Sequence, residues 1–131
     1  MPLFNKIIVI DDDPVYSFIT TELIESSTLY EQNLISYKNG VRALRDFVET
    51  DLNKLKLLIF VDLDMPIMDG WEFLDELTKS ELNPLNQIYI VSSTVNLTVK
   101  EKALSYPIVK DYISKPLLPE KLIEIENAAH K

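Results

Sequence analysis

The chain has 131 residues, 47% of them hydrophobic and 26% charged, which is typical of a globular protein and predicts one domain over residues 1–131. Its net charge of −8 repels nucleic-acid phosphates and anionic lipid headgroups, so we expect no direct contact with nucleic acid or membrane. No apolar run approaches the roughly 18 residues of a membrane span, and the N-terminus has no signal-peptide pattern, so we expect a cytoplasmic protein with protein partners.

Five short apolar runs, rich in β-branched and aromatic residues, predict buried β-strands. They are Lys6–Ile10, Leu34–Tyr37, Leu57–Val61, Ile88–Val91 and Val109–Ile113. Segments with helical spacing of apolar residues lie between them. This alternation predicts right-handed βαβ units, and therefore a doubly wound, five-stranded parallel α/β sheet with helices on both faces. Ligands of such sheets bind where the strands end at their carboxyl edge.

The first two helices are expected after the first and second strands. The earlier one begins at Pro14, with Asp13 as its N-cap. The apolar residues on the face expected to pack against the sheet are Val15, Phe18, Ile19 and Leu23. The next helix begins behind the turn at residues 39–40, and its apolar side consists of Val41, Leu44 and Val48.

Three further helices are expected in the second half of the chain. The third begins at a capping-box pattern of Asp69 and Glu72, and its buried residues are expected to be Phe73, Leu74 and Leu77. A weak fourth helix is expected from Thr98, with a thin apolar face of Val99, Ala103 and Leu104. The last helix starts near Pro119 and carries on one side Leu122, Ile125 and Ala129.

Aspartates follow two of the predicted strands directly. Asp11, Asp12 and Asp13 come after the first strand, and Asp62 comes after the third. Two carboxylates about 4 Å apart repel by roughly 4 kcal/mol at an effective dielectric of about 20, so a proton or a cation must relieve them. The chain has no cysteine, and its single histidine, His130, lies next to the C-terminus. Oxygen ligands therefore remain, and they favour Mg²⁺ over zinc or copper. In the alternative interpretation these aspartates only cap helices.

Two further polar residues stand at strand ends. Ser92 closes the fourth predicted strand, and Lys115 closes the fifth, directly before Pro116. A hydroxyl and an ammonium group thus join the carboxylates at the same edge of the sheet. Together they predict an anion site beside a metal, and a phosphoryl group is the anion that commonly needs both.

Four motifs stand in order along the chain: Ile7–Pro14 with its aspartates, the Asp-x-x-Met-Pro-x-Met-Asp-Gly block within Phe60–Gly70, Val91–Ser93, and Tyr112–Pro116. In combination they resemble the receiver domain of bacterial two-component response regulators. The resemblance covers essentially the whole chain and implies a flavodoxin-like sheet of strand order 2-1-3-4-5.

The resemblance also implies roles for individual residues. Asp62 would accept a phosphoryl group as an acyl phosphate, from a histidine kinase or a histidine phosphotransfer protein. Asp12, Asp62 and the backbone carbonyl of Asp64 would hold Mg²⁺, with Asp11 ordering a coordinated water. Lys115 would bind a phosphoryl oxygen. Such a protein hydrolyses its own aspartyl phosphate and turns over no separate substrate.

A switch and an output surface follow from the same resemblance. Ser92 would turn toward the phosphoryl group and Tyr112 would then swing inward, although a buried tyrosine at a strand end can also be simple core filling. The Lys115–Pro116 peptide bond would be cis. A downstream protein target would read the face formed by the fourth helix, the fifth strand and the fifth helix.

Two other function classes stay open at this point. The run Leu58–Asp64 also fits the Asp-x-Asp opening of haloacid-dehalogenase-type phosphatases, but those enzymes usually need a later acidic motif, and the pair Asp11 and Asp12 has no role in them. The chain could instead be a receiver-shaped binding module that no longer accepts phosphate. The complete set of motif residues argues against this second alternative.

Overall fold

The computed structural model describes residues 3–65, 67–80, 83–94 and 96–129. The histidine His130, and Pro66 of the Asp-x-x-Met-Pro-x-Met-Asp-Gly block, lie outside these residues. The strands are β1 (Lys6–Ile10), β2 (Leu34–Tyr37), β3 (Leu57–Asp62), β4 (Gln87–Ser92) and β5 (Val109–Ser114). They pair in parallel, in the order β2-β1-β3-β4-β5. The predicted sheet and its strand order are therefore confirmed.

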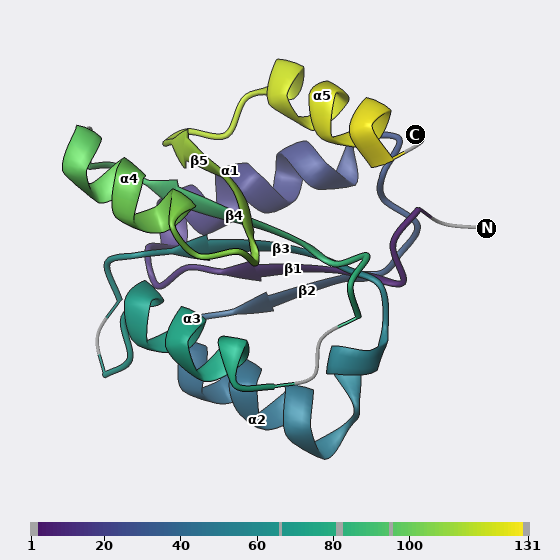
Figure 1. Ribbon diagram of the computed structural model, residues 1–131. Helices are drawn as coiled ribbons and strands as arrows, with labels where there is room; N and C mark the ends of the chain where they lie inside the picture. Colours follow the sequence, from purple (N-terminus) through teal and green to yellow (C-terminus); the bar gives the residue numbers. More distant parts are fainter. Residues whose placement is uncertain (1–2, 66, 81–82, 95, 130–131) are drawn as a thin grey trace.

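Helices cover both faces of this sheet. They are α1 (Pro14–Glu25), α2 (Gly40–Glu49), α3 (Gly70–Thr78), α4 (Leu97–Leu104) and α5 (Pro119–Ala129), with a short 3₁₀ helix η1 (Leu52–Lys54) before β3. Ile24 of α1 and Ile125 of α5 belong to the core on one face, whereas Phe47 of α2, Phe73 of α3 and Ala103 of α4 belong to the core on the other. Figure 1 shows α1 and α5 above the sheet, and α2 and α3 below it. None of the described helices is long and apolar enough to cross a membrane.

Helix α3 forms as predicted and fixes the loop after β3. The Asp69 carboxylate accepts a hydrogen bond from the Glu72 N–H at 2.9 Å, and the Glu72 carboxylate accepts one from the Asp69 N–H at 3.3 Å. Gly70 opens the helix and donates its N–H to the Leu63 carbonyl at 2.9 Å. A Cβ at Gly70 would lie 2.6 Å from the carbonyl oxygen of Asp62, so only glycine fits this close approach.

The start of α1 is predicted correctly, but its buried face only in part, since Leu23 alone of the four predicted residues packs against the core. Asp13 caps the helix by accepting from the N–H groups of residues 15 and 16. Val15 and Phe18, however, are each 64% exposed, and the buried residues are Thr20 and Ile24. Thr20 and Ile24 are one turn apart and form the row that faces the sheet. The apolar residues of the first two turns, including Ile19, lie beside this row and face solvent.

Two other helices need smaller corrections. Helix α2 buries Ala43 and Phe47, while Val48, expected in the core, is 74% exposed. Helix α4 is capped by Asn96, whose side chain accepts from the N–H of Thr98 at 2.8 Å, so Thr98 lies inside the helix and is not its cap. Residue 104 is exposed, which leaves α4 with one fully buried side chain. In α5, the predicted burial of residues 122 and 125 is confirmed.

Candidate functional site

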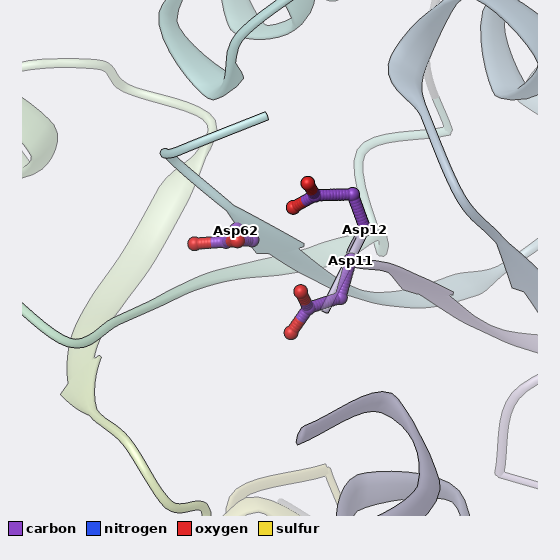
Figure 2. Close-up of side chains that lie close together, drawn as sticks. All are labelled: Asp11, Asp12 and Asp62. Atoms are coloured by element: carbon purple, nitrogen blue, oxygen red, sulfur yellow. The ribbon is translucent and has the colours of Figure 1, made fainter. Parts of the chain in front are cut away.

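The three predicted carboxylates come together because β1 and β3 are neighbours in the sheet. Asp11 and Asp12 follow β1, and Asp62 ends β3, at the same edge. One carboxylate oxygen from each lies within 4.8 Å of the others. Figure 2 shows the three side chains sharing one small space beyond the strand ends. Asp11 and Asp62 are buried, whereas Asp12 is exposed.

Backbone turns hold these carboxylates in place. The N–H of Asp13 donates to Asp11 Oδ1 at 2.9 Å, so the chain folds over the Asp11 side chain before α1 begins. The N–H of Asp64 donates in the same way to Asp62 Oδ1, at 3.3 Å. Each buried aspartate thus accepts from the amide two residues later. These bonds orient the free oxygens toward the shared space.

Lys115 completes the cluster from the end of β5. Its side chain is 5% exposed, and Nζ lies 2.9 Å from Asp11 Oδ2 and 3.4 Å from Asp62 Oδ2. The backbone N–H of Lys115 donates to the carbonyl of Ser92 at 2.9 Å, which ties the ends of β5 and β4 together. The Lys115–Pro116 peptide bond is cis, as predicted.

The electrostatics of the cluster are those of crowded carboxylates around one cation. Burial, followed by the charge of Asp11, raises the pKa of Asp62 to about 6, although Lys115 opposes the shift. Burial alone would lower the pKa of Lys115, but its hydrogen bond to Asp11 and the charges of both carboxylates outweigh burial and raise it. Lys115 therefore stays charged at neutral pH, and three carboxylates face one ammonium group.

An open hollow of about 430 Å³ gives solvent access to the cluster. It is lined by Asp12, Asp13, Pro14, Tyr16, Asp62, Asp64, Ser93 and Lys115. Asp64 is exposed at this hollow. Ser92 does not line it, because its side chain is fully buried and its hydroxyl accepts from the N–H of Thr94 at 3.1 Å.

Thr94 also contacts the other residue of the expected switch. The buried Tyr112 donates its hydroxyl to the backbone carbonyl of Thr94. The loop after β4 is therefore held by Ser92 through the Thr94 N–H and by Tyr112 through the Thr94 carbonyl. The structure links Ser92 and Tyr112 through one loop residue that the sequence did not single out.

Tyr16 is a further residue of the cluster that sequence reasoning missed. Its ring lies over the Lys115 ammonium group, with Nζ 4.6 Å from the ring centroid. Tyr16 stands in the first turn of α1, which places its ring at the edge of the hollow. An aromatic residue at this point in a helix carries no sequence motif, so no pattern could have revealed the contact.

Comparisons with known proteins identify the family and agree with this fold. The model of the response regulator receiver domain family matches residues 7–127, so the chain belongs to this family. Hybrid signal transduction histidine kinase I of Dictyostelium discoideum is 30% identical over 127 residues. The match covers 94% of this chain and 7% of that protein, so the chain spans only a small part of this relative's length.

Solved structures give the same answer for the fold. A two-component response regulator from Cytophaga hutchinsonii is 27% identical and superposes with a TM-score of 0.83, with 97% of each chain covered. A response regulator receiver protein from Dyadobacter fermentans is 22% identical, with a TM-score of 0.78 over 95% of this chain and 97% of that one. At 22% identity, the similarity to the Dyadobacter fermentans protein supports the fold alone.

Proposed function

We propose that this receiver domain accepts a phosphoryl group on Asp62 and signals through a changed protein surface. The observation that carries the proposal is the position of Asp62. This buried carboxylate lies at an open hollow, beside the ammonium group of Lys115 and the carboxylates of Asp11 and Asp12. Receiver domains act with histidine kinases or histidine phosphotransfer proteins, and we propose a partner of this kind as the donor.

The transfer itself is a displacement at phosphorus. A carboxylate oxygen of Asp62 forms the new P–O bond, while the bond between phosphorus and the donor's nitrogen or oxygen breaks and the donor keeps the electron pair. Asp62 must be ionised to attack, and a pKa of about 6 leaves it mostly ionised above neutral pH. The Lys115 ammonium group offsets the negative charge that arrives on the phosphoryl oxygens.

The donor set of the cluster fits Mg²⁺. Three carboxylates with oxygens within 4.8 Å of one another face one ammonium group, so excess negative charge remains. Asp12, Asp62 and the carbonyl of Asp64 would hold the ion, with Asp11 ordering one of its waters. The bound ion would neutralise charge on the carboxylates and on the phosphoryl group.

The route from Asp62 to the surface runs through the loop after β4. A phosphoryl group carries up to about two negative charges and attracts hydroxyl donors. If the Ser92 hydroxyl turns toward it, the bond that Ser92 accepts from Thr94 is lost, and the loop that Tyr112 also holds is free to rearrange. Helix α4 follows this loop and buries a single side chain, so it can shift at low cost. We propose that a protein target reads the face of α4, β5 and α5.

The proposal is tested by intact mass after incubation with acetyl phosphate, with and without Mg²⁺, on wild type and on Asp62→Asn. The expected result is the gain of one phosphoryl group that needs Mg²⁺ and is absent from the variant. If wild type gains nothing, and beryllofluoride also leaves the emission of Trp71 unchanged, the chain is instead a binding module that works without phosphate. Sustained turnover of a small phosphate ester would indicate a phosphatase.

A further inference from the structure

Strand β2 leaves one row of backbone groups without a neighbouring strand. It is one of the two edge strands of the sheet and pairs with β1 alone (Figure 1). The carbonyl of Asn33 accepts from the N–H of Ile7 in β1, and that of Tyr37 from the N–H of Asp11 directly after β1, at 3.0 Å each. Because successive residues of a strand point their backbone groups to opposite sides, those of Leu34 and Ser36 face outward. The N–H of Lys38, directly after the strand, also points outward, since the Tyr37 carbonyl in the same planar peptide faces Asp11. Such an edge is a template for one more strand.

A hollow flanks this edge on each side of the sheet. The hollow on the α2 side measures about 690 Å³, and the one on the α1 side about 660 Å³. Ser36 and Lys38 line both of them, so the two hollows meet along the outer edge of β2. An extended peptide beside β2 would therefore place alternate side chains in the two hollows.

The hollow on the α2 side is basic, in a chain of net charge −8. It is lined by Lys38 and by both arginines of the chain, Arg42 and Arg45, which are exposed on α2. Among the described residues, neither guanidinium group forms an ion pair. The one carboxylate lining this hollow, Asp46, accepts the Tyr37 hydroxyl at 2.6 Å. Arginine pairs well with carboxylates, so this side suits acidic side chains.

The hollow on the α1 side has a different character. Phe18 and Leu34 give it an apolar wall, and Phe18 is one of the residues that α1 leaves exposed. Asp12 and Glu25 also line it, and their charge disfavours an acidic side chain there. Apolar side chains are the better match on this side.

We propose that the outer edge of β2 binds an extended segment of a partner protein as an additional strand, with acidic side chains toward α2 and apolar side chains toward α1. Main-chain hydrogen bonds to residues 34, 36 and 38 supply the alignment, and Arg42 and Arg45 select the acidic face. This surface is separate from the face of α4, β5 and α5, and its use does not require a phosphoryl group on Asp62.

The test is an NMR titration of the ¹⁵N-labelled full chain with a capped peptide of alternating Glu and Val. The expected result is saturable shifts of the amide signals of Leu34, Ser36 and Lys38, and no such shifts with a peptide of alternating Lys and Val. The double variant Arg42→Glu/Arg45→Glu should bind at least tenfold more weakly. A matched control, Lys79→Glu/Lys100→Glu, makes the same change in net charge at the C-cap of α3 and on α4, and should bind as wild type does.

Three outcomes would overturn the inference: no saturable shift, equal shifts with both peptides, or shifts that map to another face. A loss of affinity as large in the control variant as in the arginine variant would also overturn it, because net charge alone would then explain binding. The titration is run without Mg²⁺ on wild type and on Asp62→Asn. Its result therefore does not depend on phosphorylation. Peptide binding at β2 can fail while phosphoryl transfer to Asp62 is confirmed, and the reverse also holds.

Discussion

The ring of Tyr16 covers the ammonium group of Lys115 at 4.6 Å, on the side of the cluster that opens to solvent. A cation–π contact of this kind contributes about 2 kcal/mol when the cation is desolvated. Since Lys115 also lies 3.4 Å from Asp62 Oδ2, we expect the ring both to hold Lys115 in place and to limit the approach of water to a phosphoryl group on Asp62.

The first prediction concerns this ring. In Tyr16→Leu we expect the aspartyl phosphate to hydrolyse several-fold faster than in wild type, because the ring is lost. Tyr16→Phe keeps the ring and should behave as wild type. The measurement is the decay of the phosphorylated mass after the donor is removed. Equal decay rates in all three proteins would show that the ring has no such role.

The second prediction concerns the pH dependence of stability. Asp62 has a folded-state pKa of about 6, above its unfolded value of about 4, so its protonation stabilises the fold fully below about pH 4 and this stabilisation is lost as pH rises through 6. Without Mg²⁺, Asp62→Asn should therefore raise the free energy of unfolding at pH 7.5 by about 1–3 kcal/mol, and by much less at pH 4.5. Urea denaturation at the two pH values measures this difference.

Mg²⁺ provides the control for that experiment. An ion that binds the folded state alone stabilises it, and Asp62→Asn removes one of the proposed ligands. Addition of Mg²⁺ should thus stabilise wild type more than the variant. The difference between their free energies of unfolding at pH 7.5 should therefore become smaller. If the variant were less stable than wild type at pH 7.5 without Mg²⁺, the ionised Asp62 carboxylate would not be destabilised by its burial and by Asp11, and the prediction would be wrong.

The third prediction compares the two glycines of the chain. A Cβ at Gly70 would lie 2.6 Å from the Asp62 carbonyl oxygen and 2.7 Å from the Leu63 Cα, and backbone cannot move aside cheaply. Gly70→Ala should destabilise the fold by about 1–3 kcal/mol. At Gly40 the nearest atoms are side-chain atoms of Phe73 and Met68, at 3.1 and 3.2 Å. Gly40→Ala should change stability by less, and thermal unfolding of both variants checks the order.

The sequence predicted best where several local signals agree within one segment. In α3 the capping box, Gly70 and the spacing of the apolar residues all indicate the same helix and the same buried face. In α1 the cap correctly marks the start, but the buried face depends on where the sheet lies beneath the helix. Phe18 is as apolar as a core residue and yet points to solvent, because the packed row begins at Thr20.

In the candidate site, too, the residues marked by sequence signals were predicted, and those placed only by tertiary packing were not. Asp11, Asp62 and Lys115 come together as predicted, since each stands at the carboxyl end of a strand and parallel strands share one edge. Tyr16 and Thr94 escaped prediction because their contacts use a ring on a helix and a backbone carbonyl in a loop. Neither contact leaves a pattern in the order of residues.

The fourth prediction concerns backbone strain at Ile67. This β-branched residue has φ of 69° in the loop between β3 and α3, and its side chain is 85% exposed. The left-handed conformation costs a residue with a Cβ about 1–2 kcal/mol, and asparagine tolerates it better. Since little packing is lost, Ile67→Asn should raise the free energy of unfolding by about 1 kcal/mol. Ile67→Val keeps the branched Cβ and should give no gain; a similar gain in both variants would rule out strain as the cause.

The most direct test of the account is to locate the phosphoryl group on the chain. Borohydride reduces an aspartyl phosphate and leaves a stable product at that one residue, which peptide mass spectrometry then identifies. After reaction with acetyl phosphate and Mg²⁺, we expect the reduced product at Asp62 and at no other aspartate. Reduction at Asp11, Asp12 or Asp64, or a phosphorylated protein that yields no reduced aspartate, would contradict the assignment of Asp62 as the phosphoryl acceptor.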